Sequence, residues 1–236
     1  MLFVGRGESV MGAPFDPGPP GEREVRIPFG AHELDADLVV GPPGRGIVVF
    51  AHGSGSGRKS PRNREVARRL QTAELGTLLL DLLTASEART DERTAQYRFD
   101  IPRLTERLLV ATDWLGHQPE TGTRPLGFFG ASTGGAVAMR AAVERADRVD
   151  AIVLRGARSD LGDPVAERIR CPTLILVGEE DPEVRKLNQQ TMRLLRCPKK
   201  LTVIPGASHL FEEEGALEAV AVETSAWFVR HLGGPR

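Results

Sequence analysis

The sequence predicts an α/β protein with a mostly parallel β-sheet flanked by helices. Two observations lead to this fold class: short apolar runs typical of strands buried on both faces, and helical patterns that separate them. Strands that alternate with helices in this way form right-handed βαβ units and a parallel sheet. At 236 residues, the chain can bury a large core within a single domain.

The predicted elements follow one another without internal repeats. Residues 1–21 are rich in glycine and proline and lack sustained periodicity, so we expect a flexible N-terminal tail, followed by one domain over residues 22–236. Alternating patterns at residues 24–28 and 33–40 predict an antiparallel hairpin. Buried strands are then expected at residues 47–51, 77–82, 126–129, 151–154, 173–177 and 201–204, with helices at residues 62–73, 101–115, 133–145, 183–195 and 216–231.

A polar insert, residues 83–99, follows the strand expected at residues 77–82. Its position is informative, because open α/β sheets bind ligands outside the carboxyl ends of their strands. The insert can therefore overhang a binding site.

The composition of the chain argues against nucleic-acid binding, membrane insertion and cysteine-based metal or redox chemistry. With 31 basic and 32 acidic residues, the chain has no electrostatic footprint for nucleic acid. It has neither an apolar run long enough to cross a membrane nor the charged and apolar regions of a signal peptide. The spacing of Cys171 and Cys197 suggests neither a metal site nor a redox pair. We therefore expect a cytoplasmic protein that binds no metal, nucleic acid or membrane.

The most informative motif is Gly130-Ala131-Ser132-Thr133-Gly134, between an apolar strand and a helical pattern. This is the arrangement of a nucleophile elbow, in which a strained serine at a strand-to-helix turn exposes its hydroxyl above the sheet. The flanking glycines are needed because neighbouring elements pack too closely for a Cβ. The motif predicts Ser132 as a nucleophile.

A serine hydroxyl needs a base and an orienting acid, which follow the elbow in the chain order serine, acid, histidine. Asp181 and His209 each come just after a later predicted strand, so all three residues would meet at one sheet edge. His209 would accept the Ser132 proton, and Asp181 would fix the imidazole tautomer.

Several residues compete for these roles. His52 also follows a strand, and it is the main alternative to His209 as the base. Glu179 and Glu180 precede Asp181, and a glutamate can serve as the acid. Asp160 and Asp163 are weaker candidates for the same role.

Acyl transfer also requires donors for an oxyanion. The Thr133 amide follows the nucleophile and opens a helix, so it is one candidate. The glycine-rich loop at residues 52–57 supplies the second, at Ser54 or, failing that, at Gly55. Such loops also cradle phosphates, but this one has neither the GxGxxG spacing nor the P-loop pattern.

Together the motifs resemble the α/β-hydrolase superfamily, and more narrowly its dienelactone hydrolase-like branch. The segments that carry the resemblance are HGSGSGRKSPRN from His52, DLLT from Asp81, FGASTGG from Phe129 and PGASHLF from Pro205. The resemblance implies a sheet of about eight strands whose second strand is antiparallel. No segment of the chain is long enough for a large cap domain. The resemblance also implies hydrolysis through an acyl-enzyme without a cofactor, and it assigns Ser132, Asp181 and His209 as the triad and Ser54 with Thr133 as the oxyanion donors. The founding dienelactone hydrolases use cysteine at the elbow, whereas this chain has serine.

The leading hypothesis is a serine carboxylesterase that hydrolyses small short-chain or aryl esters. A lactonase or dienelactone hydrolase-like enzyme, or an acyltransferase, could use the same triad, and a non-catalytic ligand-binding relative is the non-enzyme alternative. We expect Arg155, at a strand end, either to bind a substrate carboxylate or to be paired structurally. The candidate substrate-pocket residues are Leu82, Leu83, Tyr97, Arg155, Leu161 and Phe211. The oligomeric state is not predicted.

Overall fold

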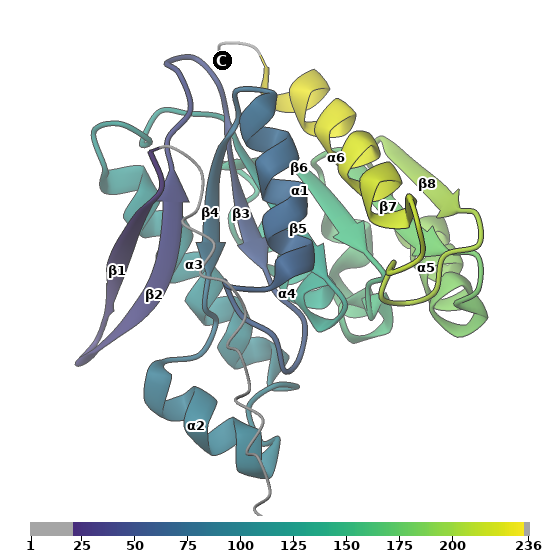
Figure 1. Ribbon diagram of the computed structural model, residues 1–236, viewed down its shortest axis with the longest axis horizontal. Helices are drawn as coiled ribbons and strands as arrows, with labels where there is room; N and C mark the ends of the chain where they lie inside the picture. The colour runs from purple at the N-terminus through teal and green to yellow at the C-terminus, as the bar shows by residue number, and fades with distance from the viewer. Residues whose placement is uncertain (1–20, 234–236) are drawn as a thin grey trace, which may run out of the picture.

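A computed structural model describes residues 21–233, so residues 1–20 of the predicted tail lie outside the described residues. One eight-stranded sheet runs through the described part of the chain, in the order β1-β2-β4-β3-β5-β6-β7-β8 (Figure 1). β2 is antiparallel to both β1 and β4, and the other neighbours are parallel. The strands are β1 (Arg23–Phe29), β2 (His32–Val39), β3 (Ile47–Ala51), β4 (Gly76–Leu80), β5 (Leu126–Ala131), β6 (Val149–Arg155), β7 (Thr173–Gly178) and β8 (Lys199–Ile204). The predicted fold class and the antiparallel second strand are confirmed.

Helices cover both faces of the sheet (Figure 1). They are α1 (Pro61–Thr72), α2 (Ala85–Thr94), α3 (Ile101–His117), α4 (Thr133–Glu144), α5 (Pro182–Leu194) and α6 (Ala216–Leu232), with two short 3₁₀ helices, η1 (Ser159–Leu161) and η2 (Asp163–Arg168). The five long helices α1, α3, α4, α5 and α6 were expected within two residues of these bounds, whereas α2 and the two 3₁₀ helices were not expected.

The core consists of two apolar layers, one on each side of the sheet. Alternation along β3 shows how the strands divide between them: Val48 and Phe50 pack with α1 and α6, whereas Ile47 and Val49 pack with α3 and α4. All four side chains are buried, as expected for a strand in the middle of a parallel sheet. The parallel pairing of β3 to β8 places the loops that follow these strands along one edge of the sheet.

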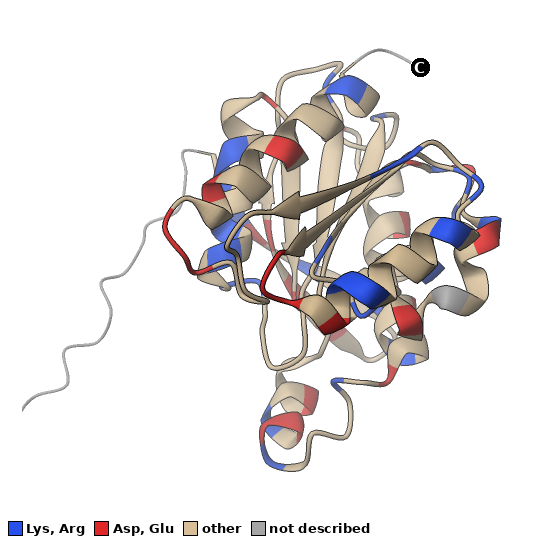
Figure 2. Cartoon of the chain, turned by 90° about the vertical axis from the view of Figure 1, so that its right-hand side faces the viewer, with Lys and Arg blue, Asp and Glu red and all other residues tan. Residues whose placement is uncertain are grey.

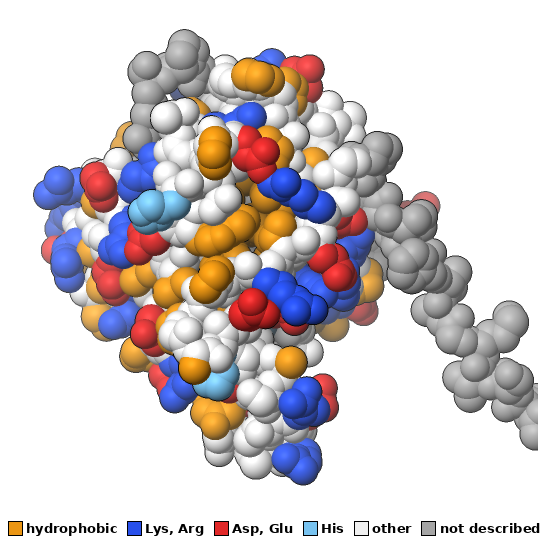
Figure 3. Space-filling view, turned by 90° about the vertical axis from the view of Figure 1, so that its left-hand side faces the viewer, with side chains coloured by type: hydrophobic (Ala, Val, Ile, Leu, Met, Phe, Trp, Pro, Cys, Tyr) orange, Lys and Arg blue, Asp and Glu red, His pale blue; other side chains and the backbone are white. Residues whose placement is uncertain are grey.

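Charged residues lie mainly on the helices and loops, while most of the sheet is free of them (Figure 2). On the face that carries β1, β2 and α3, basic and acidic side chains are interspersed (Figure 3). The arginines of α1 follow this pattern, because Arg62, Arg64 and Arg69 each pair with a carboxylate. Arg62 and Arg69 thus belong to a salt-bridged surface, whereas Arg64 is buried.

The polar insert is mainly helical, which the sequence analysis did not anticipate. α2 begins with a capping box, in which the Thr84 hydroxyl accepts from the Glu87 amide and the Glu87 carboxylate accepts from the Thr84 amide. It stands beyond the carboxyl ends of the parallel strands, at the bottom of Figure 1. The insert therefore lies over the edge of the sheet where ligands bind in such folds.

Within residues 21–233, no helix is long and apolar enough to cross a membrane. The same residues contain no group of three or more histidine, cysteine, aspartate or glutamate side chains placed to hold a metal ion. Cys171 and Cys197 are both buried free thiols, and burial raises the pKa of the Cys171 thiol to about 12. This thiol is therefore protonated and unreactive at neutral pH.

Candidate active site

Ser132 occupies a strained turn between β5 and α4. Its backbone has φ 51° and ψ −120°, a conformation that only glycine adopts readily. The turn is held from both sides, because the Ser132 amide donates to the Arg155 carbonyl at 3.0 Å and its own carbonyl accepts from the Arg158 amide at 3.0 Å. The surrounding hydrogen bonds thus maintain a strained serine, as the elbow motif predicts.

The two flanking glycines are required by close packing. A Cβ on Gly130 would lie 2.5 Å from the Gly134 carbonyl oxygen, and one on Gly134 would lie 2.5 Å from the His52 carbonyl oxygen. Neither contact is compatible with a side chain. The first turn of α4 can approach the ends of β5 and β3 only because these positions lack one.

Asp181 and His209 are hydrogen-bonded to each other. Asp181 Oδ2 lies 2.6 Å from His209 Nδ1, and the other carboxylate oxygen, Oδ1, accepts from the Val184 amide at the start of α5. Since an ionised carboxylate can only accept, Nδ1 carries the proton and Nε2 is left as an acceptor. The Asp181 side chain is 13% exposed and that of His209 is 38% exposed, so the acid is buried beneath a base that solvent can reach.

The imidazole of His209 lies next to the turn that holds Ser132. A Cβ on Gly156 would be 3.5 Å from His209 Cε1, and Gly156 directly follows the residue whose carbonyl accepts the Ser132 amide. Gly156 has φ +53°, a left-handed backbone conformation that favours glycine, and a Cβ at this position would meet the ring at ordinary van der Waals distance. The loops after β5, β6, β7 and β8 therefore meet at one edge of the sheet.

Three of the competing candidates, His52, Glu179 and Asp160, are engaged in other contacts. His52 is buried and uses both ring nitrogens, because Nε2 accepts from the Leu82 amide at 3.0 Å and Nδ1 lies 2.9 Å from the Gly53 carbonyl oxygen. Burial lowers the pKa of His52, which keeps its ring neutral. Glu179 accepts from the Gly206 amide on the surface, and Asp160 pairs with Arg158 at 2.8 Å.

The two predicted oxyanion donors line one cavity. Thr133 is the first residue of α4, so its amide has no partner within the helix. Ser54 lies in a turn from Gly53 to Ser56, closed by a 3.2 Å hydrogen bond between the Ser56 amide and the Gly53 carbonyl. A Cβ on Gly53 would be only 3.1 Å from Ser132 Cβ, so this loop passes directly against the nucleophile turn.

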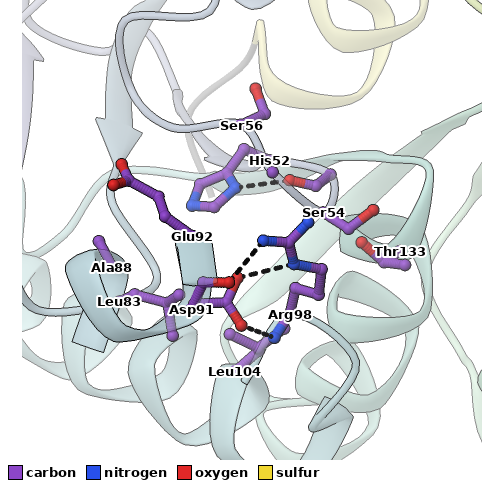
Figure 4. A pocket seen from close by; sticks show the side chains of 12 residues that line it. His52, Ser54, Ser56, Leu83, Ala88, Asp91, Glu92, Arg98, Leu104 and Thr133 are labelled. Atoms are coloured by element: carbon purple, nitrogen blue, oxygen red, sulfur yellow. Dashed lines mark hydrogen bonds and ion pairs between the residues drawn. The ribbon is translucent and has the colours of Figure 1, made fainter. Parts of the chain in front are cut away.

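The cavity has a volume of about 110 Å³ and lies between the loop after β3 and the insert after β4 (Figure 4). The insert and α3 contribute an apolar part, with Leu83, Ala88 and Leu104, and a charged part, with Asp91, Glu92 and Arg98. Residues 52–56 and Thr133 complete the lining. The cavity thus connects the polar insert to the predicted oxyanion donors.

Of the six predicted pocket residues, Leu83 lines this cavity. Leu82 and Phe211 are fully buried side chains, and the Tyr97 ring stacks against the Arg103 guanidinium at 4.9 Å. Leu161 packs against the larger apolar layer from η1. These four residues surround the strand ends without lining the cavity.

Arg155, the sixth, is a buried arginine beside the nucleophile turn. It is 8% exposed, and its guanidinium carbon lies 5.8 Å from the centre of the Phe129 ring and 5.9 Å from that of Phe211. Burial, with a smaller effect from the nearby charge of Arg62, lowers its pKa to about 10. Nη1 has no hydrogen-bond partner among the described residues. The side chain therefore packs between aromatic rings, and its backbone carbonyl supports Ser132.

Sequence reasoning did not identify Asp91 and Arg98 as site residues. Asp91 is 4% exposed and accepts from the Tyr97 and Arg98 amides and from Arg98 Nε. Asp91 lies in α2 and Arg98 lies beyond its end, so no helical periodicity in the sequence links the two residues. The Thr84-x-x-Glu87 pattern is typical of a helix start, so it could have predicted α2 and therefore a structured insert.

Comparisons with known proteins agree with this geometry. A structure of dienelactone hydrolase from Anabaena variabilis is 50% identical, with a TM-score of 0.88 over 89% of this chain and 98% of that chain. Est1E from Butyrivibrio proteoclasticus shares the fold at 15% identity, with a TM-score of 0.75 over 89% of this chain and 99% of that one.

A Mycobacterium tuberculosis protein with the provisional name phosphoribosyl transferase is 46% identical over 214 residues, which are 91% of this chain and 47% of that protein. The chain thus spans about half the length of this curated relative. The model of the dienelactone hydrolase family matches residues 38–228, which include every residue of the candidate site. The chain therefore belongs to the dienelactone hydrolase family of α/β-hydrolases.

Proposed function

We propose that this protein is a serine carboxylesterase that hydrolyses small short-chain or aryl esters through an acyl-enzyme. The observation that carries the proposal is the 2.6 Å hydrogen bond between Asp181 and His209 beside the strained Ser132 turn. Membership of a hydrolase family and the fold shared with Est1E are consistent with it.

In the first half of the reaction, Ser132 Oγ attacks the ester carbonyl while His209 Nε2 accepts its proton. Asp181 holds Nδ1 protonated and stabilises the imidazolium that forms. The tetrahedral oxyanion would be held by the amides of Thr133 and Ser54, and the α4 N-terminus adds a favourable partial charge. His209 then protonates the departing alcohol, which leaves an acyl group on Ser132.

In the second half, water replaces the alcohol. His209 takes a proton from the water, and the hydroxide attacks the acyl carbonyl through a second tetrahedral intermediate held by the same donors. Collapse of this intermediate releases the acid and returns the proton from His209 to Ser132. In this scheme every proton transfer passes through one imidazole, so the reaction needs no cofactor.

The test is hydrolysis of p-nitrophenyl acetate and butyrate by the wild type and by Ser132→Ala. The wild type should turn over both esters, and Ser132→Ala should lose about 10³-fold or more in kcat, because the nucleophile is gone. Equal rates for the two proteins would exclude Ser132 as the nucleophile. A fluorophosphonate probe should label the wild type and leave Ser132→Ala unlabelled; an unlabelled wild type would favour a non-catalytic ligand-binding relative.

The Anabaena relative named dienelactone hydrolase supports a second candidate, a lactonase with the same triad. Parallel assays of a small lactone and its open-chain ester distinguish the two, since a lactonase has the larger kcat/KM for the lactone. An acyltransferase would differ in how the acyl-enzyme reacts with competing acceptors. An added alcohol or amine would take the acyl group in preference to water, and the transfer product would exceed the free acid.

A further inference from the structure

The cavity beside the proposed oxyanion donors has two chemically different parts (Figure 4). Leu83, Ala88 and Leu104 form an apolar part, and Arg98 and Thr133 contribute donors. The Thr133 hydroxyl is buried and has no hydrogen-bond partner among the described residues. Thr133 as a residue lines the cavity, but its hydroxyl oxygen is closed off from solvent, so Arg98 is the side-chain donor that a ligand in the cavity can reach.

Arg98 is held so that one nitrogen remains available to the cavity. Nε donates to Asp91 Oδ2 at 2.8 Å, and Nη2 donates to the Asp91 carbonyl at 2.7 Å. The third nitrogen, Nη1, has no acceptor among the described residues and would lie 3.7 Å from a Cβ on Gly55, so it points at the loop that holds Ser54 (Figure 4). The guanidinium is thereby pre-organised, and a ligand oxygen could bind Nη1 without disturbing the ion pair.

The charge around this nitrogen disfavours an anionic ligand. Asp91 is ionised, because hydrogen bonds from the Tyr97 and Arg98 amides and from the Arg98 guanidinium outweigh the effect of burial and lower its pKa. Glu92 adds a second carboxylate to the lining. The lining therefore carries two carboxylates and one guanidinium, and a further negative charge on the ligand would be repelled.

We propose that this cavity binds the acyl group of the substrate, and that Arg98 Nη1 selects short acyl chains that carry a neutral oxygen substituent, such as alkoxy, hydroxy or oxo acids. The apolar part receives the carbon chain, while Arg98 Nη1 donates to the substituent oxygen. Plain alkanoyl groups leave this donor unpaired, and chains ending in a carboxylate meet Asp91 and Glu92. The proposal rests on the esterase function inferred above.

The test compares three p-nitrophenyl esters with similar acyl chains: butyrate, methoxyacetate, in which an oxygen replaces one methylene, and the half-ester of succinate. The readout is the ratio of kcat/KM for methoxyacetate to that for butyrate, measured in the wild type and in Arg98→Met. Comparing this ratio between variants cancels the greater intrinsic reactivity of methoxyacetate and any general loss of activity.

Arg103→Met is the matched control, because Arg103 pairs with Asp100 and Glu87 in the same region but does not line the cavity. We expect Arg98→Met to lower the ratio about tenfold, as befits loss of a hydrogen bond to a charged donor, and Arg103→Met to leave it unchanged. Equal ratios in the wild type and Arg98→Met would overturn the proposal while leaving the esterase function intact. A wild type inactive on all three esters would overturn both.

A second variant does not depend on the Asp91–Arg98 pair. Glu92 is exposed, so Glu92→Gln should fold normally. It should raise kcat/KM for the succinate half-ester about threefold relative to butyrate, since it removes one of two repelling charges. No change, or a fall, would contradict the charge argument.

Discussion

Asp181 Oδ2 lies 2.6 Å from His209 Nδ1, although the two residues are 28 positions apart on the loops after β7 and β8. The contact requires a proton on Nδ1, and it places the acceptor nitrogen, Nε2, at the opposite side of the ring. One hydrogen bond thus determines which atom of His209 can act as a base.

Asp181→Asn should therefore lower kcat for p-nitrophenyl acetate by about 10⁴-fold, because the amide stabilises the wrong tautomer and cannot balance an imidazolium. Asparagine still caps a helix, so the melting temperature should change little. Asp160→Asn, which removes a surface carboxylate paired with Arg158, should retain full activity. If the Asp181→Asn variant retained most of the wild-type kcat, another residue would have to serve as the acid.

Ser132 should make the protein less stable than a glycine would. At an ordinary position alanine is more stabilising than glycine, but at φ 51° a Cβ is strained. Ser132→Gly should therefore have a free energy of unfolding about 1 kcal/mol higher than Ser132→Ala, with both variants inactive. Urea denaturation measures the difference. The opposite order would mean that the turn stores no strain.

Gly134→Ala should be strongly destabilising, since its Cβ would lie 2.5 Å from the His52 carbonyl oxygen. Overpacking of this kind costs about 1–3 kcal/mol and would also displace the loop at residues 52–57. Gly116→Ala provides the comparison, because this glycine lies in α3 with no atom within 4 Å of the new Cβ. It should raise stability by about 0.5–1 kcal/mol. Similar denaturation midpoints for the two variants would rule out the packing argument.

His52 should make stability fall in mild acid. Burial lowers its pKa in the folded state, whereas the unfolded chain takes up the proton near pH 6.5. The stability present above pH 6.5 is therefore lost as the pH falls below it, by up to about 1.4 kcal/mol per pH unit. Asp81 acts in the opposite direction, because burial raises its pKa.

Comparison of the wild type with His52→Gln isolates the histidine. The variant should show a shallower loss of stability between pH 6.5 and 5, whereas His32→Gln, at an exposed position, should follow the wild type. If the free energy of unfolding fell equally with pH in the wild type and His52→Gln, another titrating group would be responsible for the pH dependence.

The strands, five helices and the order of the site residues could be predicted because each leaves a local pattern. Buried strands such as residues 173–177 are continuous apolar runs, and the Asp181-Pro182 pair marks a helix start through the cap and the fixed proline φ. α2 could not be found by periodicity, since its exposed face is polar and Asp91 is its only buried residue.

The direction in which each side chain points at the strand ends could not be predicted from the sequence either. Leu82 and Leu83 are adjacent in sequence, yet Leu83 lines the cavity and Leu82 is fully buried. Phe211 was expected at the pocket but adopts φ 56° and packs beneath, against Arg155. Such choices depend on turns whose conformation is set by tertiary contacts, which a single sequence does not display.

The hydrogen bonds and ion pairs of the insert join its residues to one another and to α3. Thr84 and Glu87 form the capping box, Arg98 is bound to Asp91, and Glu87 also pairs with Arg103 and Arg107 of α3. The proposed triad and oxyanion donors are set by the sheet and by α4. Residues 83–107 thus carry the side chains of the insert and α3 that line the cavity, together with the ion pairs that join them, so transplanting this longer segment between relatives should change acyl preference while leaving the proposed triad of the recipient in place.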